Sequence, residues 1–313
     1  ATMYIVALRI FVYVVPTVPA AGHKAVLSIG AEHWLPTSGI GGEIICVLLI
    51  LLQAILLNLM VSQYRIGKEI TLFPGLIYAL LVGGMPDAAH WAPVMIANTF
   101  FIVALFALFS TYKKSASAGA IFNVGLSIAL ASLFYYSYFW FFIMAIIGLS
   151  ILRNFRLQEL WTLLIGFMVP FYLTAVVYFW MDDLGGFWFQ QFNANHTLLD
   201  FRQIAGIDLT IKLVLFAILV LICLLSYSRY LMKKNIQVQK NIDILFWALL
   251  FAGVSVFIQS EAGPDHLMML APSLAILLSL SWLDLKPPYA ELAHLLLLFT
   301  FLFLQYAGYF GLI

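Results

Sequence analysis

The chain has 313 residues, of which 64% are hydrophobic and only 9% are charged, and its formal net charge at pH 7 is +1. Soluble domains carry about 25% charged residues, so this composition excludes an ordinary water-soluble domain and indicates an all-α protein that crosses a membrane several times. A net charge near zero gives no reason to expect a nucleic-acid partner. We expect one transmembrane domain over 1–313.

Apolar segments separated by short polar stretches predict about eleven membrane helices. The first, Met3–Ala20, is expected to be retained rather than cleaved as a signal peptide, because Arg9 interrupts its apolar run. The segments that follow it, apart from a central hairpin, are Glu43–Ser62, Ile70–Gly84, Trp91–Ser110, Leu160–Trp180, Thr210–Tyr230, Leu245–Gln259, Leu267–Leu283 and Ala290–Tyr309. The longer polar loops are expected at His23–Gly42 and Met181–Asp208.

The central hairpin lies between Lys114 and Arg153, where 38 consecutive residues carry no charge. A single helix of that length would extend about 57 Å, whereas the hydrocarbon core is about 30 Å thick. Two shorter helices with a turn near Tyr135–Tyr138 satisfy both constraints, and their tyrosines suit a membrane–water interface. Both charged ends of the hairpin then lie on one side of the membrane.

Basic residues accumulate in loops that alternation places on that same side. These residues, 11 of the 15 lysines and arginines, are Arg65, Lys68, Lys113, Lys114, Arg153, Arg156, Arg229, Lys233, Lys234, Lys240 and Lys286. Basic loops mark the cytoplasmic side. The pattern therefore predicts a multi-pass protein of the bacterial inner membrane with a cytoplasmic N-terminus.

Acids and histidines gather on the opposite, outer side, so a functional site is expected there. Glu32 and His33 are candidates for a catalytic acid–base pair, since a carboxylate beside an imidazole is tuned toward neutral pH. Arg9, a costly charge inside the first helix, is expected either to contact a lipid phosphate or to pair with Glu43. The remaining candidate ligand-binding residues are Asp182, Asp183, Arg202, Glu261, Asp265 and His266.

Each of these residues also has a simpler interpretation as an ordinary loop residue. Asp182 and Asp183 suit a divalent cation or a sugar hydroxyl, but they also suit a helix-end turn with Gly185 and Gly186. The outer-side histidines lack the i, i+3 or i, i+4 spacing of a helical metal motif. We therefore expect no metal ion and no cofactor.

Several segments resemble an uncharacterised family of polytopic inner-membrane proteins found in Bacteroidota. The resemblance covers roughly Gln53 to Leu173 and more weakly His266–Leu280. Its segments are AILLNLMVSQYRIGKEITLFPGLIYALLVGGMPD, APVMIANTFFIVALFALFS, AIFNVGLSIALASLFYYSYFWFF, LIGFMVPFYL and HLMMLAPSLAILLSL.

More distantly, the layout is similar to the membrane half of C-type, polyprenyl-phosphate-sugar-dependent glycosyltransferases. The similar features are an arginine in the first helix, an acid in the first outer loop and a late Pro-containing helix, APSLAILL. The resemblance implies sugar transfer from a lipid phosphate at the outer face. Glu32, or alternatively Glu43, would be the acid, and Arg9, Arg202 or Lys212 would meet the phosphate.

Three functions are therefore open. The chain could be a subunit or accessory protein of a larger envelope assembly, with membrane lipid and other membrane-protein subunits as partners. It could be a glycosyltransferase that uses a polyprenyl-phosphate-linked sugar. It could be a transporter, although few charges besides Arg9 lie inside the predicted helices.

Overall fold

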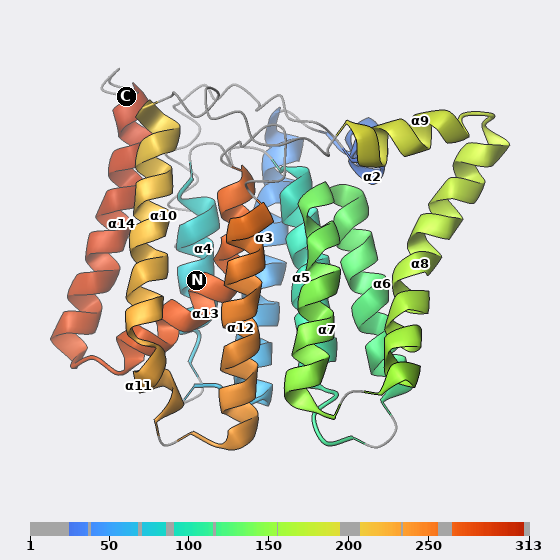
Figure 1. Cartoon of the computed structure of the whole chain (residues 1–313). Helices are drawn as coiled ribbons and strands as arrows, with labels where there is room; N and C mark the ends of the chain where they lie inside the picture. Colours follow the sequence, from blue (N-terminus) through green and yellow to red (C-terminus); the bar gives the residue numbers. More distant parts are fainter. Residues whose placement is uncertain are drawn as a thin grey trace.

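A computed structural model of the chain shows a bundle of helices that run mostly along one direction (Figure 1). The structure describes residues 25–36, 39–67, 71–85, 91–114, 117–154, 156–194, 207–232, 234–255 and 265–309. Over these ranges no β-strand occurs, which confirms the all-α prediction. The first predicted helix, Met3–Ala20, lies outside the described residues.

Each predicted membrane segment that falls within these ranges coincides with one or more helices. The main helices of the bundle are α3 (Gly39–Gln63), α4 (Phe73–Gly83), α5 (Pro93–Phe109), α6 (Ala118–Phe134), α7 (Phe141–Leu152), α8 (Leu157–Trp180), α10 (Ile207–Leu225), α12 (Ile236–Ser255), α13 (Asp265–Leu283) and α14 (Pro287–Tyr309). Within the described part of the chain, four helices are long and apolar enough to cross a membrane: α3, α8, α13 and α14. Several of the others are apolar but shorter.

Short helices occupy segments that the sequence analysis assigned to loops. Helix α2 (Val26–Trp34) lies in the first polar loop, and α9 (Leu184–Trp188) with the π-helical turn η3 (Phe189–Asn193) lies in the second. Both α2 and α9 lie across the upper end of the bundle in Figure 1. At the lower end, α11 (Tyr227–Leu231) is separated from α10 by a turn at Ser226, where one continuous helix was predicted.

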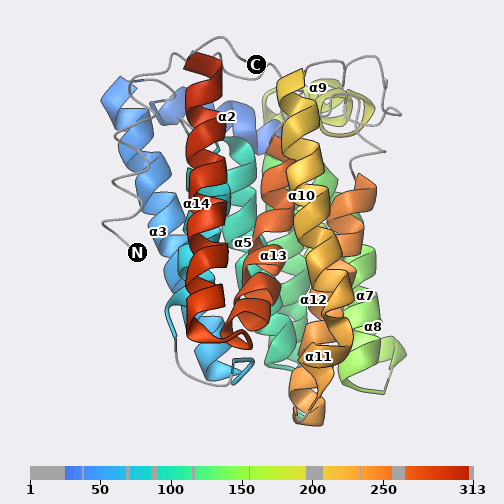
Figure 2. The same cartoon turned by 90° about the vertical axis from the view of Figure 1, so that its left-hand side faces the viewer.

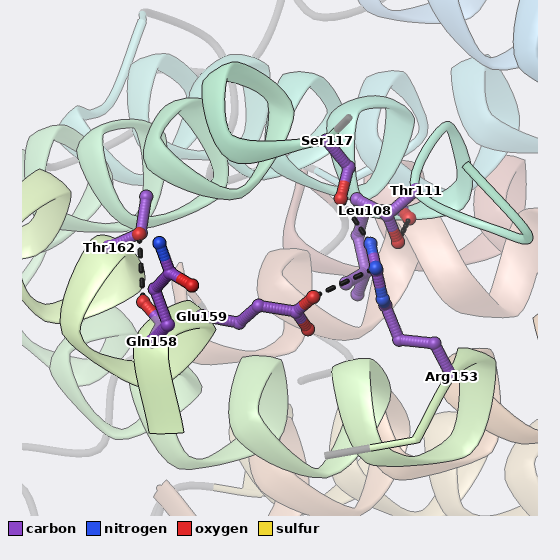
Figure 3. A network of polar contacts seen from close by, with 7 residues as sticks. All are labelled: Leu108, Thr111, Ser117, Arg153, Gln158, Glu159 and Thr162. Carbon is purple, nitrogen blue, oxygen red and sulfur yellow. Dashed lines mark hydrogen bonds and ion pairs between the residues drawn. The ribbon is translucent and has the colours of Figure 1, made fainter. Parts of the chain in front are cut away.

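The central hairpin consists of α6 and α7, joined by the 3₁₀ turn η2 (Tyr136–Trp140). Arg153, just after α7, donates a hydrogen bond to Ser117, just before α6, and pairs with Glu159 of α8 at 2.8 Å (Figure 3). These contacts bring both ends of the hairpin together, as predicted. The turn differs from the prediction in one respect: Tyr136, Ser137 and Tyr138 are buried rather than exposed at an interface.

Helices α6 and α8 cross in close backbone contact. A Cβ atom at Gly125 would lie 2.2 Å from the Leu163 carbonyl oxygen, and one at Gly166 would lie 2.3 Å from that of Phe122. Only glycine permits this approach, which is typical of packed membrane helices. Beyond this crossing, α8 leans away from the bundle toward its upper end (Figure 1).

Helix α13 forms the core of the bundle. In its apolar stretch, His266–Leu283, 89% of the residues are buried, against 39% for α3, 28% for α8 and 17% for α14. It packs against α4, α5, α10, α12 and α14, and Figure 2 shows it among these helices. The apolar side chains of α13 therefore pack in the protein interior, whereas many of those on α3, α8 and α14 lie on the outer surface.

Candidate functional sites

His266, at the upper end of α13, is held between two hydroxyl groups of the hairpin turn. Its Nδ1 lies 2.9 Å from the Tyr135 hydroxyl and its Nε2 lies 3.1 Å from the Ser137 hydroxyl. The Tyr135 and His266 rings also meet edge to face at 5.3 Å. All three side chains are at least nine-tenths buried, so the cluster ties the hairpin to the central helix.

The arrangement of the two hydroxyl groups around the His266 imidazole determines what chemistry this cluster could perform. A hydroxyl on one imidazole nitrogen and an orienting group on the other is the arrangement of a nucleophile, its base and a positioning residue. The two grooves described below are lined by other residues, so neither leads to Ser137. A buried imidazole with a hydrogen-bond partner on each nitrogen is also what a purely structural joint requires.

A second polar cluster lies in the core and joins five elements. Tyr138 of η2 donates to Asn98 of α5, and the Asn98 amide donates to Tyr78 of α4 at 3.4 Å and to the Met268 carbonyl of α13 at 3.0 Å. Tyr78 in turn donates to the Gln53 side chain of α3 at 2.6 Å. Each of these side chains is fully buried.

Gln53 extends this chain back to α5, donating to the Met95 carbonyl and to the Thr99 hydroxyl. The amide and hydroxyl groups thereby satisfy one another, as buried polar groups must. The sequence analysis did not select Gln53, Tyr78, Asn98 or Tyr138. The available signal was an amide or phenol inside each of four apolar segments, without any indication of which ones meet.

The predicted acid–base pair Glu32 and His33 lies on α2 at the upper end. Glu32 is half-buried, whereas His33 is exposed and contacts the Trp34 ring edge to face at 6.1 Å. Gln191 of η3 fastens this helix to the bundle. Its side chain accepts from the Val26 amide at 3.2 Å and donates to the Ser132 carbonyl of α6 at 2.9 Å.

Asp182 and Asp183 occupy the corner between α8 and α9, and both are exposed. Asp183 caps α9, because its Oδ1 accepts a hydrogen bond from the Gly186 amide at 3.0 Å. Asp182 has a left-handed backbone, with φ of 56°. The two carboxylates thus have the geometry of a helix-end turn and lie at the same end of the bundle as Glu32.

Several predicted site residues fall outside what the structure describes: Arg9, Arg202, Glu261 and the side chain of Asp265. Glu43, the alternative acid, is half-buried near the upper end of α3, and its Oε2 has no hydrogen-bond partner within the described residues. Lys212, on α10, is buried. Across the described ranges, no group of three or more histidine, cysteine or acidic side chains is placed to hold a metal ion.

Two apolar grooves open on the sides of the bundle. One, of about 600 Å³, lies between α3, α5 and α6, and its lining includes Leu59, Thr99, Phe106, Asn123 and Ser127. The other, of about 930 Å³, lies between α10 and α12 beside the end of α7. Both were missed by the sequence analysis, because grooves are made by the spacing of helices rather than by any one segment.

Comparison with known proteins adds no relative from which a role can be carried over. No family model matches the chain, and neither does any curated protein or solved structure.

Proposed function

We propose that this chain is a multi-pass protein of the bacterial inner membrane and serves as a subunit of a larger membrane assembly, with a partner's transmembrane helix docked in the groove between α3, α5 and α6. Two observations support this proposal. One is the apolar outer surface of the long helices. The other is Asn123, whose amide faces outward from α6 and has no partner among the residues that the structure describes.

Two of the long helices, α3 and α8, expose apolar side chains over most of their length. On α3, exposed apolar side chains recur every three or four residues: Ile40, Ile44, Leu48, Leu52, Ile55 and Leu59. Helix α8 exposes Trp161, Ile165, Met168, Tyr172 and Val177 in the same way. Soluble monomers rarely expose continuous apolar surface of this extent, whereas lipid-facing helices require it.

The proposal of a partner helix rests mainly on Asn123. It is exposed, lies about 8 Å along α6 from its first residue, and lines the apolar groove with Ser127 and Leu130 on the same helix face. Its amide has no hydrogen-bond partner among the described residues, and an amide left facing lipid is costly. Transmembrane helices associate through such amides and through small residues that allow close approach, which Ser127 and Ala107 supply here.

Replacement of Asn123 by leucine tests the role of the amide. In a mild detergent, we expect the wild-type protein extracted from membranes to run as a complex larger than its 35.2 kDa chain. Asn123→Leu should shift this complex toward the monomer, while Asn123→Gln, which keeps an amide, should retain most of it. The measurement is native electrophoresis with mass analysis of the bands.

A matched control is Ser150→Leu, on an exposed position of α7 whose hydroxyl already bonds the Ile146 carbonyl. This change adds similar apolar bulk away from the groove and should leave the complex intact. A wild-type chain that is monomeric in native membranes would contradict the subunit proposal. So would a complex that Asn123→Leu leaves unchanged.

A second function, sugar transfer from a polyprenyl phosphate, is favoured by one observation: half-buried Glu32 and the Asp182–Asp183 corner lie at the same end of the bundle (Figure 1). Glu32→Gln keeps the size of the side chain and removes its charge. If Glu32 is the catalytic acid, this variant should abolish an envelope glycan without changing expression. Unchanged glycans at normal protein levels would eliminate the enzymatic function.

A further inference from the structure

Among the residues that the structure describes, the larger groove is lined by a single charged side chain, Asp243. It is lined by Ile151 of α7, by Val220 and Leu224 of α10, by Tyr227 of α11, and by one face of α12 that runs from Asp243 to Val254. Its volume of about 930 Å³ lies within the range of ligand sites, roughly 300–1,000 Å³. Apart from Asp243, the Tyr227 hydroxyl and the Trp247 indole N–H, the described lining side chains are apolar.

The length of the groove fits one leaflet of a bilayer. Asp243 and Val254 are separated by 11 residues of α12, which corresponds to about 16 Å of helix. Half of a hydrocarbon core of about 30 Å is about 15 Å. The groove therefore has the length of a lipid's acyl region in one leaflet, and it is too short to seat a helix that crosses the whole membrane.

The polar groups lie at one end of this groove, because Asp243 is the lining residue closest to the start of α12 and Tyr227 bonds to it. Tyr227 donates a hydrogen bond of 2.8 Å to the Asp243 carboxylate. The second carboxylate oxygen can accept from a ligand. An acid at this position favours a cationic headgroup that donates hydrogen bonds and disfavours an anionic one.

The nearest basic residues in the sequence are engaged elsewhere. Lys240, three residues before Asp243, directs its Nζ to the Leu152 carbonyl at 3.3 Å and to the Tyr112 ring. Arg229, two residues after Tyr227, donates to the Ser226 hydroxyl at 2.8 Å. The described structure thus gives Asp243 a hydroxyl partner but no cation.

We propose that the groove between α10 and α12 binds one phospholipid whose headgroup carries a primary ammonium, with the ammonium at Asp243 and the acyl chains along α12 toward Val254. This proposal rests on the membrane insertion proposed above, but not on the partner at Asn123. A primary ammonium brings three hydrogen-bond donors, which a quaternary ammonium lacks.

The experiment titrates the full-length protein, purified in detergent, with phosphatidylethanolamine, phosphatidylcholine or phosphatidylglycerol of identical acyl chains, and counts bound lipids by native mass spectrometry. We expect phosphatidylethanolamine to bind roughly fivefold more tightly than the other two, as a partly exposed ion pair provides. Asp243→Asn should remove this preference without abolishing binding.

Gly253 provides a second test that does not depend on charge. A Cβ atom at this groove position would meet no atom within 4 Å, so we expect Gly253→Leu to fold and to place its side chain in the groove. It should weaken binding of all three lipids. Asp284→Asn, an exposed change in the turn before α14, is the matched control and should change none of the three affinities.

Equal affinity for the three lipids, or a preference that survives Asp243→Asn, would overturn the lipid proposal. The lipid proposal would also be overturned if the groove held a protein chain instead of a lipid, and if Gly253→Leu released that protein chain. These outcomes leave membrane insertion standing, since insertion fails only if the protein does not enter the membrane fraction.

Discussion

At the scale of single residues, polar side chains inside apolar helices have two different environments. Asn98 is fully buried and has Tyr78, Tyr138 and the Met268 carbonyl as partners. Asn123 is exposed and faces a groove. Replacement of each asparagine by alanine therefore removes the same atoms from opposite settings, which makes the two variants a matched pair.

We expect Asn98→Ala to lower the free energy of unfolding by about 1–3 kcal/mol, because it leaves the buried partners of the amide without hydrogen bonds. Asn123→Ala should stay within about 0.5 kcal/mol of wild type, as an exposed substitution does. Thermal unfolding of both variants in the same detergent measures the difference. Equal losses of stability would contradict the structural role given to Asn98.

The sequence shows where such residues are but not what they meet. Gln53, Tyr78, Asn98 and Tyr138 each interrupt an apolar run, and the cost of burying them implies partners. The partners come from segments 20 to 170 residues apart, so only the packed bundle reveals them. His266 was selected from the sequence as a ligand-binding residue, whereas its two hydroxyl partners depend on how α13 meets the hairpin turn.

At the scale of helices, the crossing of α6 and α8 depends on two glycines. We expect Gly125→Ala to destabilise the fold by about 1–3 kcal/mol, since its methyl group would overlap the backbone of α8. Gly119→Ala, in the first turn of α6, meets no atom within 4 Å and should be neutral or slightly stabilising. Unfolding of the two variants side by side is the measurement, and similar stabilities would contradict the close crossing.

Gln191 gives a similar test for the surface helix α2. Gln191→Ala removes both hydrogen bonds that join η3 to α2 and α6, so hydrogen exchange in Val26–Trp34 should become faster. Gln190→Ala, one position earlier, removes a 3.4 Å bond from Tyr178 of α8 and keeps both Gln191 bonds, so it should leave α2 protected. Equal hydrogen-exchange rates of Val26–Trp34 in the two variants would contradict the role given to Gln191 in holding α2.

Helix positions were predictable wherever apolar runs end at charges. The hairpin followed from segment length, because one helix of 38 residues cannot fit a bilayer, and the place of its turn followed from the tyrosines at 135–138. The start of α12 was misplaced at Leu245 instead of Ile236 because Lys240 and Asp243 looked like loop residues. In the fold, Lys240 bonds a carbonyl of α7 and Asp243 bonds Tyr227, so both charges are accommodated on the helix.

At the scale of the whole molecule, the described connections after α5, α7 and α11 lie at one end of the bundle, and α2 and α9 lie at the other (Figure 1). The first group contains Lys113, Lys114, Arg153, Arg156 and Lys234. This separation agrees with the distribution of charge from which sidedness was predicted. Insertion in a membrane, with the basic end in the cytoplasm, remains the proposal on which the partner and lipid sites depend.

Cysteine labelling in sealed membrane vesicles tests that proposal most directly. With buried Cys46 and Cys223 replaced by alanine, single cysteines at Lys114 and Leu184 sit at exposed positions at opposite ends of the bundle. A membrane-impermeant maleimide should label Leu184→Cys only from the periplasmic side and Lys114→Cys only from the cytoplasmic side. Labelling of both positions from one side would contradict the proposed topology.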